Sequence, residues 1–91
     1  MNKSELVARV AAKSGLSNTA SHSAVNAFME SVKDALASGD NVTLIGFGTF
    51  EVRDRAARTA RNPRTREEIT IPASKLPAFR AGKTFKAQVN E

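Results

Sequence analysis

Hydrophobic residues in the first forty positions recur at the spacing of helices. After Asn2, the apolar residues Leu6, Val7 and Val10 fall on one side of a helical turn. Asn2 is a favoured N-cap residue, and Gly15 is a favoured residue just past a helix end. The pattern therefore predicts a first helix between these two positions.

A longer apolar stripe predicts a second helix between Ser17 as N-cap and Gly39. Its members are Val25, Phe28, Met29, Val32 and Leu36. Two helices joined around a glycine are typical of an αα-hairpin, which resembles a helix-turn-helix reader of DNA. The second helix, however, carries Lys33 as its single basic residue, against Glu30 and Asp34. Such a helix is poorly equipped to read base edges.

The hydrophobic period changes from 3.6 to 2 after Gly39. Alternating positions, with a glycine-containing turn at 46–48, predict a β-hairpin; they are Val42, Leu44, Phe50 and Val52. Phe79 is expected in a strand that rejoins this sheet. A short helix is expected after Gly82, with Phe85 and Val89 at i and i+4.

Two interpretations fit the segment 54–74, which is poor in large apolar side chains. One is a solvated, disordered basic loop. The other is a two-stranded ribbon, because Arg53 and Arg55 alternate as on a strand and residues 62–65, Asn-Pro-Arg-Thr, suit a type I β-turn. As a continuous strand, residues 53–61 would reach roughly 30 Å at ~3.3 Å per residue.

The remaining 70 of the 91 residues are few for a stable core. The predicted helix stripe and the phenylalanines nevertheless offer much apolar surface. We therefore expect a two-fold dimer. The expected dimer core comprises Phe28, Met29, Val32, Leu44, Phe47, Phe50 and Phe79. One sequence leaves open whether the partner is a second copy or a related chain.

Charge is distributed unevenly along the chain, whose net charge is +5. Residues 1–52 hold four basic and five acidic residues, a net of −1, whereas residues 53–91 hold ten basic and four acidic residues, a net of +6. This asymmetry indicates an anionic partner, such as nucleic acid, a membrane surface or an acidic protein. The chain has no cysteine, no apolar run near the ~20 residues of a membrane span, and a polar N-terminus unlike a secretory signal. A cytoplasmic location is expected.

Signatures of catalysis are weak. His22 is the one histidine and fits a surface position. Gly82-Lys83-Thr84 matches the end of a phosphate-binding loop, but Pro77 replaces its first glycine and seven residues follow it. The pairs Asp34 with Asp40 and Glu67 with Glu68 fit a solvated surface. We expect no enzyme, no catalytic residue, no metal, no cofactor and no small-molecule substrate.

The strongest chemical signal is a set of six arginines within fourteen residues: Arg53, Arg55, Arg58, Arg61, Arg64 and Arg66. The planar, permanently charged guanidinium fits phosphates and the walls of a narrow groove. A two-stranded ribbon can enter such a groove. Pro63 at its tip is either an ordinary turn proline or a rigid apolar wedge that opens a base step.

At these residues the sequence resembles the HU and integration host factor family of bacterial histone-like DNA-bending proteins. The resemblance covers essentially the whole chain. Its motifs are Asn2-Lys3-Ser4-Glu5-Leu6, Gly46-Phe47-Gly48-Thr49-Phe50, Arg61-Asn62-Pro63, Ile71-Pro72-Ala73, Pro77-Ala78-Phe79 and Gly82-Lys83.

The resemblance implies an α+β fold: a helical hairpin, a three-stranded antiparallel sheet extended into a two-stranded β-ribbon arm, and a short C-terminal helix, in an intertwined dimer. It implies one domain over 1–91. Residues 1–40 would be the helical dimerisation body, 41–53 and 75–82 the β saddle, 54–74 the DNA-binding arm and 83–91 the C-terminal helix.

The resemblance also implies site residues. Pro63 corresponds to the intercalating proline, with Arg61 and Asn62 beside it. The other implied DNA contacts are Lys3, Gly46, Gly48, Arg53, Arg55, Arg58, Lys75, Arg80, Lys83 and Lys86. Ala60 and Arg66 replace glycines common in the family, and Arg64 and Arg66 make the tip more cationic.

These features predict a homodimer that binds and bends double-stranded DNA with little sequence preference, through the minor groove, and condenses the nucleoid. It should prefer bent, nicked or flexible DNA. Binding to RNA stays open, although the chain lacks Tyr and Trp for base stacking. The alternative from another class is a basic module that docks on an acidic protein or membrane.

Overall fold

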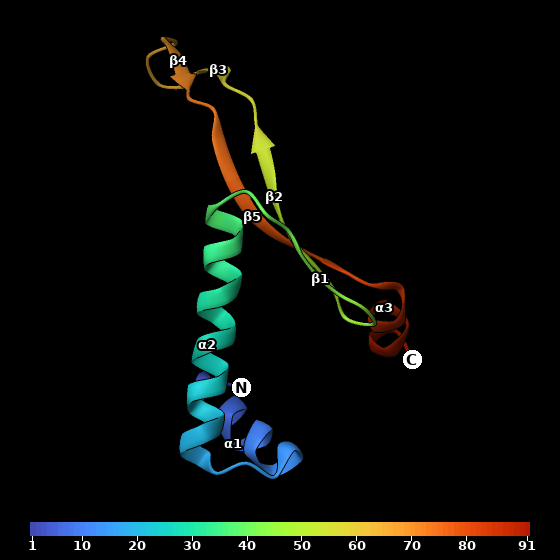
Figure 1. Ribbon diagram of the computed structural model, residues 1–91. Coiled ribbons are helices and arrows are strands. Elements are labelled where there is room, and N and C mark those ends of the chain that lie inside the picture. Colours follow the sequence, from blue (N-terminus) through green and yellow to red (C-terminus); the bar gives the residue numbers. More distant parts are fainter. The chain divides into compact units, whose positions relative to one another are not determined.

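The computed structural model describes all 91 residues, which fall into two compact units, Met1–Ala35 and Leu36–Glu91 (Figure 1). The N-terminal unit holds α1 (Lys3–Ser14) and most of α2 (Asn18–Ala37). The C-terminal unit holds β1 (Val42–Leu44), β2 (Gly48–Arg55), β3 (Arg58–Arg61), β4 (Glu68–Ile71), β5 (Ser74–Ala81) and α3 (Lys83–Val89). The α+β class and the order of elements expected from the sequence are confirmed.

Both long helices begin and end at the residues that the sequence indicates. The Asn2 side-chain oxygen accepts a 2.9 Å hydrogen bond from the backbone N–H of Glu5, and Gly15 ends α1 with a φ of 77°. The Ser17 hydroxyl oxygen accepts a 3.0 Å bond from the Ala20 N–H at the start of α2. Each cap satisfies a backbone group that a helix end leaves without a partner.

The main sheet has three antiparallel strands in the order β1-β2-β5. Val42 pairs with Phe50 across β1 and β2, and Phe50 pairs with Phe79 across β2 and β5. Pro77 lies in β5, an edge strand, where its missing N–H is tolerated because alternate positions of an edge strand face away from the neighbouring strand. The sheet therefore has β2 at its centre, paired along its whole length with β5.

The apolar centre of the C-terminal unit is a cluster of aromatic rings on one face of this sheet. The Phe50 and Phe79 ring centroids lie 4.8 Å apart, and Phe47 stacks on Phe85 of α3 at 5.2 Å. The Gly82 N–H donates to the Phe47 carbonyl oxygen at 2.8 Å, which ties the start of α3 to the turn between β1 and β2. The cluster remains partly open in the single chain, with Phe47 43% and Phe79 37% exposed.

The arm is a second, two-stranded sheet formed by β3 and β4, with Arg58 opposite Ile71 and Arg61 opposite Glu68. In Figure 1 it lies beyond the β2–β5 ribbon, at the end away from α3. Of the two interpretations of this segment, the two-stranded ribbon is the one that the structure shows. The predicted continuous strand over 53–61 is wrong, because pairing stops after Arg55 and resumes at Arg58. Across this gap lies Pro72, which has no N–H to donate to a ladder.

Close packing around residue 48 leaves no room for a side chain, so only glycine fits there. A Cβ at this buried position would lie 2.5 Å from the carbonyl oxygen of Arg80 and 2.6 Å from the ring of Phe79. Gly46, two residues earlier, has a φ of 85° and open space around it. The two glycines of this motif therefore serve different needs, close approach at one and backbone conformation at the other.

Replacing Gly48 with alanine should separate β2 from β5. We expect a loss of about 3 kcal/mol in unfolding free energy, the upper end for overpacking, because a backbone oxygen takes part in the clash. Gly46→Ala is the control and should lose about 1 kcal/mol through strain alone. Thermal unfolding of both variants measures the difference, and equal losses would contradict the packing argument.

Candidate nucleic-acid interface

Alternation along β2 and β5 places three arginines and the aromatic rings on opposite faces of the sheet. Side chains directly opposite in an antiparallel pair share a face. Thr49 is paired with Arg80, Glu51 with Ala78, Arg53 with Leu76 and Arg55 with Ser74. We call the face defined by Arg53, Arg55 and Arg80 the arginine face. The other face carries Phe50 and Phe79.

One carboxylate lies among these cations. The Arg53 guanidinium donates to Glu51 Oε1, at 3.1 Å from Nε and 3.0 Å from Nη2. The Glu51 side chain is 21% exposed and the Arg53 side chain 56% exposed. The reasoning from sequence missed Glu51, although its place two residues before Arg53 in a strand is the signal that puts both side chains on one face.

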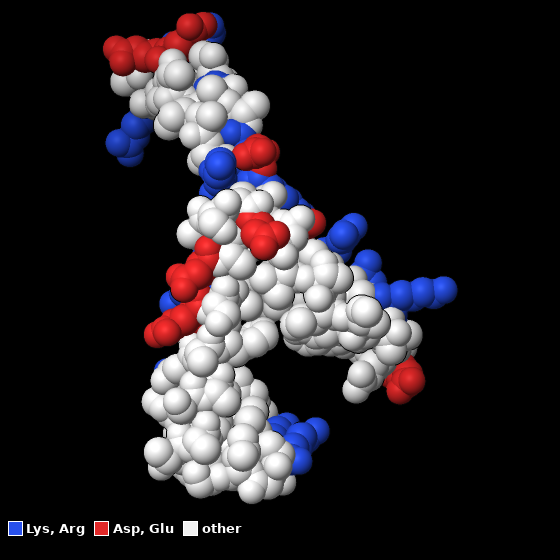
Figure 2. Space-filling model, viewed as in Figure 1, with Lys and Arg blue, Asp and Glu red and all other residues white.

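The arm distributes its arginines over both of its faces. Arg58 is opposite Ile71 and shares a face with Ala60 and its partner Ile69, whereas Arg61 lies on the other face, opposite Glu68. The arm is therefore cationic on both sides. Figure 2 shows Lys and Arg side chains along the β ribbon and the arm, and acidic side chains at the far end of the arm.

Asn62 organises the tip of the arm. Its backbone N–H donates to the Glu67 carbonyl oxygen at 2.9 Å, and its side-chain oxygen accepts a 2.9 Å bond from the Arg64 N–H. The turn closes through the Arg66 N–H, which donates to the Asn62 carbonyl oxygen at 2.7 Å. The closing bond thus comes from one residue beyond the predicted four-residue turn. Pro63 is exposed at this tip.

Arg66 has a φ of 61°, in the left-handed region that favours glycine. A residue with a Cβ adopts this conformation at a cost of roughly 1–2 kcal/mol. The wider turn explains why the left-handed conformation falls on Arg66, because the chain reverses toward β4 at this residue. The departure from the family's glycine noted in the sequence therefore falls on the one residue of the tip that needs a left-handed backbone.

The remaining site residues expected from the sequence lie apart from the arginine face. Lys75 belongs to the opposite face of the sheet, where its partner is Asp54. Lys83 and Lys86 are exposed on α3. Lys3 is the first residue of α1, in the N-terminal unit. Gly46 is exposed and Gly48 is buried, and their contacts with phosphate stay predictions.

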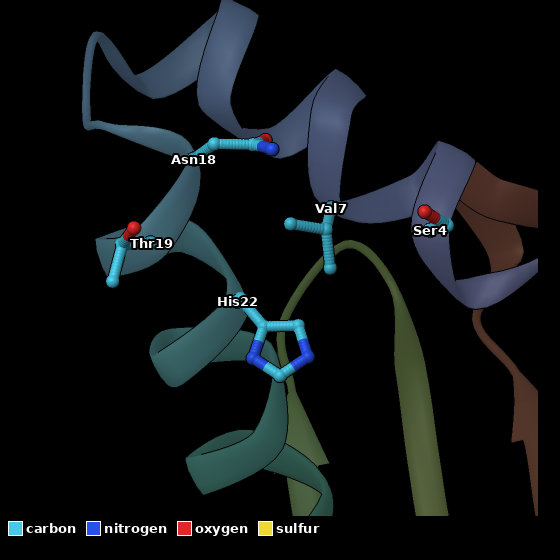
Figure 3. A pocket seen from close by; sticks show the side chains of 5 residues that line it. All are labelled: Ser4, Val7, Asn18, Thr19 and His22. Carbon is cyan, nitrogen blue, oxygen red and sulfur yellow. The ribbon is translucent and has the colours of Figure 1, made fainter.

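A shallow hollow lies between α1 and α2, lined by Ser4, Val7, Asn18, Thr19 and His22 (Figure 3). Val7 points into it, and the His22 ring lies beside it on α2. His22 Nδ1 lies 3.3 Å from the Asn26 side-chain nitrogen, within the same helix.

No group of three or more potential metal ligands occurs in the structure. None of the helices α1, α2 and α3 is long and apolar enough to cross a membrane.

A basic β-ribbon arm that extends from a small antiparallel sheet defines a class of nucleic-acid-binding protein. The family model described as "Bacterial DNA-binding protein" matches residues 1–90. The chain belongs to this family.

Its relatives include "DNA-binding protein HU" of Clostridium pasteurianum, 54% identical over 91 residues and covering all of both chains. The protein of the same name from Geobacillus stearothermophilus is 57% identical over 89 residues, with 98% of this chain and 99% of that one covered. Among solved structures, an Anabaena HU–DNA cocrystal structure matches with a TM-score of 0.89 and 48% identity, over 98% of this chain and 97% of that chain. The resemblance drawn from the sequence motifs is confirmed.

Proposed function

We propose that this protein binds and bends double-stranded DNA in the bacterial nucleoid, with little sequence preference. The observation that carries the proposal is the arginine face, which continues into a cationic arm. Arginine forks bind phosphate without reading sequence, and the arm matches the ribbon that enters a minor groove in this class of protein. Its relatives carry the name of DNA-binding proteins, and one similar structure is a complex with DNA.

The proposed contacts follow the cations along the chain. The arginine face and the arm hold the duplex, α3 and Lys3 bind phosphates at its flanks, and the tip lies in the minor groove. Arg64 and Arg66 add charge at the tip. The proposed DNA-binding residues are Lys3, Gly46, Gly48, Arg53, Arg55, Arg58, Arg61, Asn62, Pro63, Arg64, Arg66, Lys75, Arg80, Lys83 and Lys86.

The proposed active species is a homodimer. Val7, 4% exposed, is the buried hydrophobic residue of the isolated chain, while Phe28, Phe47 and Phe79 remain 45%, 43% and 37% exposed. Apolar surface of this extent in so short a chain favours burial against a second copy. In this assignment residues 1–40 form the dimerisation body, 41–53 and 75–82 the saddle, 54–74 the arm and 83–91 the terminal helix.

Dimerisation predicts a solution mass of twice the 9.8 kDa of one chain. It also predicts that the unfolding midpoint rises with protein concentration, because each folding event consumes two chains. Sedimentation equilibrium and thermal unfolding at several concentrations measure both quantities. A monomer that unfolds cooperatively, with a midpoint independent of concentration, would contradict the proposal.

Binding driven by phosphate contacts and DNA deformation predicts a characteristic gel-shift pattern. Nicked or pre-bent duplexes should bind at lower protein concentration than intact linear DNA, because part of the bending energy is already supplied. With ~6–10 phosphate contacts, affinity should fall by roughly 10³–10⁵ between about 50 and 200 mM salt. Equal affinity for all three duplexes would contradict the bending proposal, and a flat salt dependence would contradict the phosphate contacts.

Pro63 is the proposed wedge, since it is exposed at the tip, rigid and without an N–H that stacking between bases would leave unpaired. Pro63→Ala should keep most of the affinity, which comes from phosphates, and reduce the bend. Fluorescence energy transfer between dyes at the two ends of a duplex measures the bend. Pro72→Ala, at the base of the arm, is the control. A bend angle left unchanged by Pro63→Ala would refute the wedge.

A further inference from the structure

Glu51 lies on the face that carries the proposed DNA contacts. Asp54 of the same strand is a second acidic residue with which it can be compared. Both are acidic residues of β2, three positions apart, so they lie on opposite faces of the same strand. Glu51 shares its face with Arg53, Arg55 and Arg80, whereas Asp54 is opposite Lys75 on the other face. The arginine face is thus cationic with one carboxylate set inside it.

The Glu51 carboxylate is directed at Arg53. Oε1 accepts from both Nε and Nη2 of Arg53, at 3.1 and 3.0 Å. Phosphate oxygens can bind an arginine fork through these same two N–H groups, which form one edge of the guanidinium. Opposite Glu51 in β5 is Ala78, whose side chain offers no competing hydrogen bond. Arg80 of β5 is the diagonal neighbour of Glu51 on this face. Diagonal neighbours in an antiparallel pair are about 7–8 Å apart.

We propose that Glu51 is an internal competitor for the phosphate site on Arg53, and that it sets the affinity and the salt dependence of DNA binding. The inference rests on the proposed DNA-binding function. For Arg53 to contact a phosphate through Nε and Nη2, the pair with Glu51 must open. The carboxylate then remains beside the bound DNA and has to be neutralised by a cation from solution.

The competition has two measurable consequences. Glu51→Gln removes the negative charge at nearly constant size, so Arg53 should be available without breaking an ion pair. For an exposed pair this corresponds to an affinity about two- to fivefold higher per protomer. The slope of log K against log salt should also become steeper, by up to ~0.9 per protomer, because the variant no longer takes up a cation when Arg53 binds.

The experiment measures the Kd for a nicked duplex by fluorescence anisotropy at several salt concentrations. Asp54→Asn is the matched control, since it removes one negative charge from the same strand on the other face. Arg53→Gln and the double variant Glu51→Gln/Arg53→Gln complete a double-mutant cycle. We expect a larger gain from Glu51→Gln than from Asp54→Asn. In the Arg53→Gln background, the gain should fall to that of the control.

Each alternative outcome overturns the inference. Equal gains from the two neutralisations would mean that net charge alone sets affinity. A gain from Glu51→Gln that persists without Arg53 would mean that the carboxylate repels DNA directly, with no competition. If the unmodified chain fails to bind any duplex, the proposed function itself fails, and this result differs from both of the others.

Discussion

The antiparallel pairing of β2 with β5 is the interaction on which the rest of the C-terminal unit depends. It runs from Gly48 opposite Ala81 to Arg55 opposite Ser74. Since side chains alternate along a strand, one register decides which residues share each face. A slip by one residue would move Arg53 and Arg55 to the aromatic side and Phe50 to solvent. The register is held at one end by Gly48, where the two backbones approach too closely for any side chain.

The same pairing connects folding with the proposed function. The aromatic face supplies the apolar surface that stabilises the sheet, and it is incomplete in one chain, with Phe47 and Phe79 partly exposed. The other face carries Arg53, Arg55 and Arg80 together with Leu76, and its arginines lie apart from the aromatic cluster. Burying the aromatic face against a second copy would therefore leave the arginine face free for DNA. The arginines and the aromatic rings of the sheet can serve these two roles because they occupy alternate positions of the same strands.

Much of this fold follows from the sequence because its signals are local. Asn2, Gly15 and Ser17 mark helix ends, and the change of period after Gly39 marks the sheet; the structure agrees at each place. The details that the sequence did not predict depend on contacts between strands. The break after Arg55 lies across from Pro72, and the five-residue turn at Asn62 depends on backbone bonds that close only when β3 meets β4. The pair formed by Glu51 and Arg53 is an exception, because both residues lie in β2 and their spacing of two could have been recognised in the sequence.

Arg66 at the tip and Glu51 in the main sheet change the positive charge of the proposed DNA-binding surface in opposite directions. Arg66 adds a cation at a position where the backbone conformation favours glycine, so the added charge is accompanied by backbone strain. Glu51 lowers the net positive charge of its face, without backbone strain, by forming an ion pair with Arg53. The first change lies at the tip, beside the proposed wedge, and the second lies in β2, within the three-stranded sheet. In the proposed interface, Arg66 would therefore strengthen phosphate binding at the point of bending, whereas the pair of Glu51 with Arg53 would weaken it within the sheet.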